Sequence, residues 1–217
     1  MPGWQKIYEQ EKDKNFEIIA VAEDTGGAQA AGPWIEKATP GYTALIDDAH
    51  VVSRLYGLVN VPNGIWIDEK GRMVRPPEVA FTDDRYSVFT HFSSVPYLNA
   101  LRDWIDKGDK SVFALSEDEM RKRLTPESPG QLMAATEFTL AEYLHKEGHP
   151  ADAINHFKSA QQLDPDNWNF KRQAWALDQA KAKQDYGTSF ADEMKKSKKP
   201  FYPAPDIPSD KQQKDNR

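Results

Sequence analysis

The chain has 217 residues, no cysteine and a formal net charge of −6. This length can bury one good core, or one domain with an appendage. Without cysteine the chain forms no disulfide, thiolate nucleophile or cysteine-based metal site, and its acidic balance without a long basic stripe argues against nucleic-acid binding.

No apolar run approaches the length that spans a bilayer. The first six residues, Met-Pro-Gly-Trp-Gln-Lys, lack the apolar segment of a signal peptide. The compartment therefore stays open, including an extracytoplasmic one if a signal lies further upstream. No motif indicates a cofactor.

The first 55 residues predict an alternation of helix and strand. Trp4, Ile7 and Tyr8 follow a helical period, and the nearly unbroken apolar run over 16–22 is typical of a buried parallel strand. Asp47 and Asp48 can cap a following helix. In chain order we expect a helix over 1–15, a strand over 16–22, a helix over 28–37 interrupted at Pro33, a strand over 42–46 and a helix over 49–55.

The stretch from Tyr56 to Val74 carries the strongest pattern. It contains a Val61-Pro62 step, an apolar run over 65–67, the turn sequence Asp-Glu-Lys-Gly and a second apolar run. Two short β-prone runs around such a turn predict a hairpin in which Gly71 takes the positive φ.

This order of residues resembles the second half of the thioredoxin-like fold, in particular the redoxins of the TlpA/ResA type. The resemblance implies that the Val61-Pro62 bond is cis and that the backbone beside it pairs with a substrate peptide, which makes Val61 and Pro62 the predicted substrate-binding residues. The family's usual Pro-Thr is Pro62-Asn63 here. In the family this proline packs against a Cys-x-x-Cys motif, so no catalytic residue is predicted in this chain.

The start of the chain resembles the sequence that follows the second cysteine of the redox motif in that family. Met1-Pro2, Trp4 and Tyr8-Glu9 match it. We therefore expect the redox motif upstream of Met1, together with a central strand that lies between the 16–22 and 64–67 strands. A late start codon, a truncated chain or an in-frame selenocysteine codon would explain this. The alternative is a redox-dead homologue that lost the motif.

Beyond the hairpin, helix signals return. Arg75-Pro76-Pro77 is expected to end the hairpin, and 78–94 has no clear period and predicts a loop. The run 96–107 is amphipathic and is followed by Gly108, which is typical of a helix and its end. Ser116 and Glu119 form a capping-box pattern for another helix.

After a linker over 126–130, residues 134–167 resemble one tetratricopeptide repeat, and 168–181 predict a third helix. A single repeat cannot bury its own face, so it must pack on the thioredoxin-like domain or on a partner. The positions that carry the resemblance are Leu140, Ala141, Gly148, Ala153, Phe157, Ala160 and Pro165. The side chains expected to be buried are Leu140, Leu144, Phe157 and Leu163.

The sequence thus predicts an α/β thioredoxin-like domain over 1–110 that lacks its central N-terminal strand. A helical tetratricopeptide-like region over 116–183 and a tail over 184–217, rich in proline and lysine, complete the chain. The expected partners are a protein or peptide along the Val61-Pro62 loop and a protein on the helical region.

Other candidate sites have simpler explanations. His145, His149 and His156 lie close in sequence, but a turn over 148–150 breaks the i,i+4 geometry that a zinc site needs. No metal is predicted. The acidic pairs at 23–24 and 47–48 follow strands, where carboxylates can act as acids or bases, but helix capping and loop solvation explain both pairs.

Three functions fit the sequence. The first is a fragment of a thioredoxin-like oxidoreductase whose chemistry lies upstream. The second is a redox-dead module that binds peptides along the Pro62 loop, and the third is an adaptor whose helical region carries the binding. The substrate and the redox direction are open in each.

We predict that the 217-residue chain has no dithiol reductase activity, because the attacking species in that reaction is a thiolate. An insulin-reduction assay tests this against a no-protein control. Turnover above the control would contradict the prediction.

Overall fold

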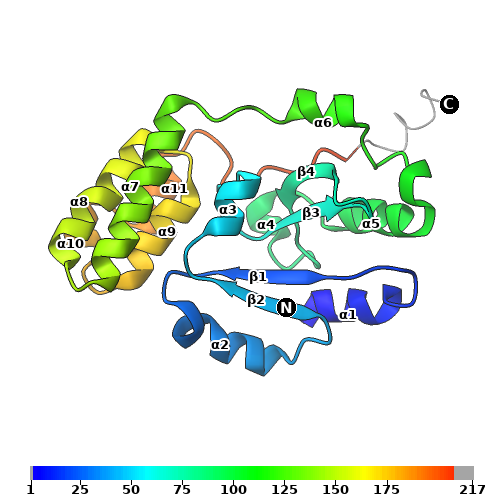
Figure 1. Ribbon diagram of the computed structural model, residues 1–217, viewed down its shortest axis with the longest axis horizontal. Helices are drawn as coiled ribbons and strands as arrows, with labels where there is room; N and C mark the ends of the chain where they lie inside the picture. The colour runs from blue at the N-terminus through cyan, green and yellow to red at the C-terminus, as the bar shows by residue number, and fades with distance from the viewer. Residues whose placement is uncertain (1, 208–217) are drawn as a thin grey trace.

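The computed structural model describes residues 2–207, so the end of the predicted tail, with Pro208, lies outside the described residues. The helices α7–α11 gather at one end of the molecule, and two small sheets with the earlier helices form the rest (Figure 1). No helix among residues 2–207 combines the length and the apolar character that crossing a membrane requires.

The elements follow the predicted order with two exceptions. The segment 78–94, expected to be a loop, contains the short helix Ser87–Thr90, and the helix Gly27–Ala38 runs through Pro33 without the expected interruption. The first half contains α1 (Pro2–Glu11), β1 (Ile19–Glu23), α2 (Gly27–Ala38), β2 (Thr43–Asp47), α3 (Val51–Tyr56), β3 (Asn63–Ile67), β4 (Met73–Val79), α4 (Ser87–Thr90) and α5 (Val95–Lys107). The second half contains α6 (Glu117–Arg123), α7 (Pro129–Lys146), α8 (Pro150–Leu163), α9 (Trp168–Leu177), α10 (Ala182–Tyr186) and α11 (Phe190–Lys196). A 3-10 turn over Gly108–Lys110 follows α5.

Each sheet in the described part of the chain has two strands. β1 pairs with β2 in parallel, from Ile19 opposite Thr43 to Glu23 opposite Asp47, and β3 pairs with β4 in antiparallel fashion. The parallel strand was predicted correctly, but its burial was wrong, since Ile19 is 63% exposed. Parallel sheets are normally covered on both faces, whereas the fully buried residues of the core clusters include none from β1 or β2.

The hairpin also agrees with the sequence in most respects. The Val61-Pro62 bond is cis and Gly71 has φ 75°, as expected. The expected end of the hairpin at Pro77 is wrong, because β4 continues to Val79. Trp66 lies opposite Arg75 and Gly64 opposite Glu78, so β4 has one extra residue in this interval. Such a bulge accommodates the two prolines, which have no N–H to donate.

The hairpin packs on α1 and α5 to form the first core. Trp66 is 3% exposed and donates its indole N–H to the Tyr97 hydroxyl at 2.9 Å. Its ring stacks on Trp104 at a centroid distance of 5.1 Å. The other buried members are Ile7, Val74, Ala80, Leu98, Ala100, Leu101 and Phe113. This core joins sequence-distant elements but leaves the β1–β2 sheet outside it.

The second core lies between α7, α8 and α9. Small residues let the helices approach, and stacked phenylalanines fill the gap: Phe138 lies 4.5 Å from Phe170 between ring centroids and 5.5 Å from Phe157. The fully buried alanines of this core are Ala134, Ala141, Ala153, Ala160 and Ala174. No strand follows Pro126 within residues 2–207.

Burial in this region corrects two expectations. Phe157 is buried as predicted and Leu144 packs at the edge of the core. Leu140 and Leu163 are instead 40% and 41% exposed. Leu140 follows Phe138 by two positions, which places it on the opposite side of α7, and Leu163 is the last residue of α8.

We expect Phe138→Ala to lower the free energy of unfolding by about 3–5 kcal/mol, because it leaves a cavity among three aromatic rings. Urea unfolding measures this change. Leu132→Ala is the control on the same helix, since Leu132 is 53% exposed, and it should change stability by less than about 0.5 kcal/mol. Equal effects of the two substitutions would contradict the assigned core.

Candidate functional site

The predicted substrate-binding residues, Val61 and Pro62, lie in the loop between α3 and β3. The Val61 carbonyl accepts hydrogen bonds from the Arg172 guanidinium at 3.1 Å and from the Tyr202 hydroxyl at 3.0 Å. The Val61 N–H donates to the side chain of Asn60 at 2.9 Å. The backbone groups expected to pair with a substrate are therefore already bonded to this chain's own residues.

Helix α9 lies directly against this loop. Its first two N–H groups, from Trp168 and Asn169, donate to the Val59 carbonyl at 2.7 and 3.1 Å, and the Asn169 amide donates to the Leu58 carbonyl at 2.8 Å. The first N–H groups of a helix have no partner within the helix. The loop supplies that partner, so the helical region packs on the preceding part of this chain, which is one of the two alternatives that the sequence left open.

The chain returns to the same loop after α11. The Asn60 amide donates to the Phe201 carbonyl at 2.9 Å, and the Phe201 ring lies edge-on to Trp168 at 4.6 Å. Further along, the Asp206 N–H donates to Glu78 at 2.9 Å. This segment, 199–206, and the loop border a cavity of about 460 Å³.

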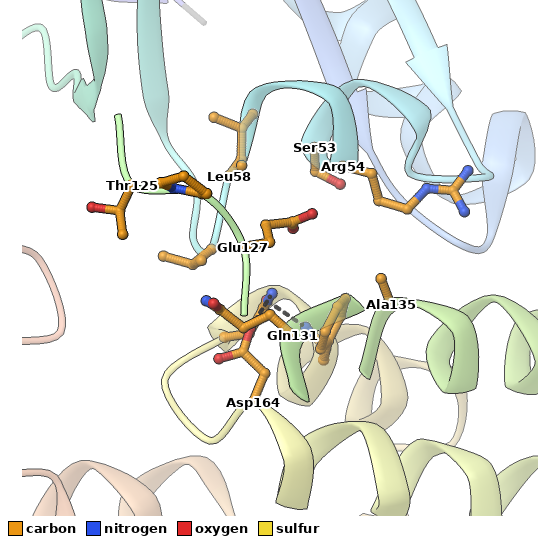
Figure 2. A pocket seen from close by; sticks show the side chains of 13 residues that line it. Ser53, Arg54, Leu58, Thr125, Glu127, Gln131, Ala135 and Asp164 are labelled. Atoms are coloured by element: carbon orange, nitrogen blue, oxygen red, sulfur yellow. Dashed lines mark hydrogen bonds between the residues drawn. The ribbon is translucent and has the colours of Figure 1, made fainter. Parts of the chain in front are cut away.

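A smaller cavity of about 150 Å³ lies on the other side of the loop. Figure 2 shows it between α3 and the start of α7, with linker residues Thr125 and Glu127 beside it. Its lining combines the Leu58 side chain with polar groups such as Ser53 and Arg54.

A chain of four buried polar side chains lies where β1 and β2 end. His50 Nδ1 is 3.1 Å from a Glu23 carboxylate oxygen, and His50 Nε2 is 3.0 Å from the Thr25 hydroxyl. That hydroxyl donates to Glu142 of α7 at 2.9 Å. Thr25 is 6% exposed, and the side chains of His50, Glu23 and Glu142 are 2–5% exposed.

Helix α9 connects this polar chain to the loop. The Gln173 amide group donates to the Glu23 carbonyl at 2.9 Å and accepts from the Thr25 N–H at 3.1 Å. Its neighbour in sequence, Arg172, holds the Val61 carbonyl. Two adjacent residues of one helix thus tie the end of β1 to the predicted substrate loop.

The order carboxylate, imidazole, hydroxyl is that of a nucleophilic triad. Here the Thr25 hydroxyl bonds to a second carboxylate and is buried, and neither of the two cavities is lined by Thr25 or His50. The arrangement can hold and share protons, but Thr25 and His50 border neither of these cavities. Burial raises the pKa of Glu142, and the nearby His50 opposes this increase.

Helix capping and loop solvation explain only some of the acidic residues at 23–24 and 47–48. Asp47 accepts from the Val52 N–H in the first turn of α3 at 2.6 Å, although the N-cap residue of that helix is His50, and Asp48 pairs with Lys146 instead. Asp24 accepts from the Gly26 N–H within its loop. Glu23 was expected to be a capping or solvated residue, which is wrong because it is buried against His50. No local pattern could have found this cluster, since Glu142 is 117 positions from Thr25.

The histidines of the helical region form no metal site. His149 is the residue before α8, and His156 Nδ1 lies 2.6 Å from a Glu137 oxygen. In the described part of the chain, 2–207, no three side chains of His, Asp or Glu are arranged to hold a metal ion.

Comparisons with family models, with curated proteins and with solved structures found no match for this chain. The resemblance to thioredoxin-like redoxins and to the tetratricopeptide repeat therefore stays a prediction from the sequence.

We expect Tyr202→Phe to lower the free energy of unfolding by about 0.5–1.5 kcal/mol, because it removes one donor to the Val61 carbonyl and keeps the ring. Urea unfolding measures the loss. Tyr143→Phe is the matched control, since Tyr143 is 59% exposed, and it should be neutral. If the two substitutions have the same effect, the segment 199–206 does not hold this loop.

Proposed function

We propose that this chain is part of a thioredoxin-like thiol–disulfide or selenol oxidoreductase, completed by a strand and a redox motif upstream of Met1. The observation that carries the proposal is the pair of two-stranded sheets. Within residues 2–207, β1 pairs only with β2 and β3 only with β4. A strand added between β1 and β3 would join the two sheets into one.

Exposed apolar side chains on the neighbouring elements support this proposal. Ile19 of β1 and Leu45 of β2 are 63% and 50% exposed, and Val51 and Leu55 of α3 are 44% and 75% exposed. Large apolar groups gathered on a surface commonly mark a contact with another segment or partner. An additional strand, with the chain leading into it, would cover such side chains.

The roles of this chain's residues follow from the proposal. The Val61-Pro62 loop would bind a peptide or protein substrate, while the thiol or selenol would come from the upstream motif. Without that motif the chain lacks dithiol chemistry, since it has no thiolate. A substrate that pairs with the Val61 carbonyl would have to displace Tyr202 or share the oxygen with it.

A redox-dead module that binds proteins is the alternative function. The occupied Val61 carbonyl favours the form of this module in which the helical region carries the binding, because the chain's own residues already make the hydrogen bonds that a substrate would make at the loop. The gene sequence immediately before the first codon distinguishes the two functions. An in-frame cysteine or selenocysteine motif there supports the oxidoreductase, and its absence supports the module.

We expect the 217-residue chain to associate through the free edges of β1 and β3, since unpaired edge strands recruit other chains. Adding the segment that precedes it in the gene should give a monomer with a higher midpoint of thermal unfolding, because the added strand satisfies both edges. Size-exclusion chromatography and thermal unfolding of the two proteins side by side measure this.

The control is the same extension with two prolines in the middle of its strand, which cannot donate to the ladder. It should behave like the short chain. A short chain that is monomeric and unfolds cooperatively at the same temperature as the extended one would contradict the missing strand and leave the redox-dead module as the better function.

A further inference from the structure

One face of α7 meets the ends of β1 and β2 through polar side chains. Thr139, Glu142 and Lys146 follow the spacing i, i+3, i+7, so they share this face. Thr139 accepts from Arg54 at 2.7 Å, and Lys146 donates to the Asp48 carboxylate at 3.1 Å. These two outer pairs are exposed to solvent, whereas Glu142 between them is buried. We call the four linked residues Glu23, His50, Thr25 and Glu142 the seam.

The hydrogen bonds of the seam require a definite number of protons. The seam has three hydrogen-bonded links: Glu23 to His50, His50 to Thr25, and Thr25 to Glu142. His50 Nε2 also lies 3.4 Å from a Glu142 oxygen. Each link needs one proton between its two atoms. A neutral imidazole and a threonine hydroxyl supply only two. If both carboxylates are ionised and His50 is neutral, one link brings two lone pairs together at about 3 Å, which is unfavourable.

One further proton satisfies all three links. If this proton is on His50, both ring nitrogens donate. If it is on Glu142, Glu142 donates to Thr25 and Thr25 donates to His50. If it is on Glu23, Glu23 donates to His50, which donates to Thr25. The buried Glu23 Oε1, which has no hydrogen-bond partner, marks the end of the chain. The other charged groups that face Glu142 are Lys146 of α7 and Arg54 of α3, and both favour its ionised form.

We propose that the seam holds one shared proton that fastens α7 to the ends of β1 and β2, so that its loss at rising pH loosens the helical region. Loss of the proton leaves two buried carboxylates and one unmade hydrogen bond. Because α7 and α9 share one core, the same loosening would weaken the contact of Arg172 with the Val61 carbonyl.

The direction of the pH effect follows from the burial of the acid. Burial raises the pKa of Glu142 above its ordinary value. An acid with a raised pKa in the folded state contributes stability at low pH, and this contribution is lost as pH rises through the folded-state pKa. Docking of α7 should therefore be strongest on the acidic side and weaken as the seam loses its proton.

The substitution Glu142→Gln tests the proposal in the full chain. A glutamine amide can donate to Thr25, which then donates to a neutral His50, so all three links form without the extra proton. Urea unfolding between about pH 5 and pH 9, a range that lies above the ordinary Glu pKa of about 4.3 and brackets the ordinary His pKa of about 6.5, should show a loss of stability at rising pH that is smaller in this variant than in the wild type.

Hydrogen exchange of the Thr25 amide reports on the seam itself, because that N–H bonds to Gln173 of α9. At alkaline pH it should exchange several-fold faster in the wild type than in Glu142→Gln, while the two proteins should match at acidic pH. Comparing both at the same pH removes the intrinsic effect of pH on exchange.

Glu137→Gln is the matched control, since Glu137 also lies on α7 and pairs with a histidine, His156 of α8, but lies outside the seam. It should keep the wild-type pH profile of Thr25 exchange. Glu23→Gln, whose amide can donate to His50 Nδ1 so that the imidazole donates to Thr25 and Thr25 donates to Glu142, should also flatten the profile, even if Glu142→Gln does not fold. A constant difference between wild type and Glu142→Gln at every pH, or an equal response in Glu137→Gln, would overturn the proposal.

Discussion

The structure depends on the Val59 carbonyl, which accepts the first two N–H groups of α9. A helix start is a cluster of unsatisfied donors, and a loop ahead of a cis-proline presents carbonyl groups that no strand uses. The loop carbonyl therefore accepts the hydrogen bonds that the first N–H groups of α9 cannot make within the helix. This contact fixes α9 against the loop, and α7 and α8 follow because they share the phenylalanine core with α9. The repeat-like hairpin, which could not bury its own face, is anchored in this way.

The same contact couples two regions that the sequence kept apart. Arg172 holds the predicted substrate loop and Gln173 holds the end of β1, where the seam begins. A change in the seam is therefore transmitted to the loop through one helix. The segment 199–206 also binds the loop: the Tyr202 hydroxyl donates to the Val61 carbonyl, and the Phe201 carbonyl accepts from Asn60. Access to Val61 depends on elements more than a hundred residues away.

Buried apolar packing is distributed unevenly over the molecule. The hairpin with α1 and α5, and the helical region, each have a core of buried aromatic and small side chains. The β1–β2 sheet contributes no fully buried side chain to either core and holds its place through polar contacts of Glu23, Thr25 and the α3 start. A parallel sheet of two strands is a poor independent unit, which is the physical basis for expecting an additional strand beside it.

The sequence by itself determined the local structure. Helical period, the capping patterns and the turn at Gly71 depend on neighbouring residues, so the helices and the hairpin could be predicted, whereas the cis Val61-Pro62 bond was expected from the family resemblance of 56–74. The tertiary structure decided what these elements touch. Leu140 follows the repeat pattern yet faces solvent, and Glu23 follows a loop pattern yet is buried against His50, because a helix or sheet face is set by what packs on it. Glu142, Gln173 and Tyr202 reach their partners across more than a hundred positions, and no local period encodes such a contact.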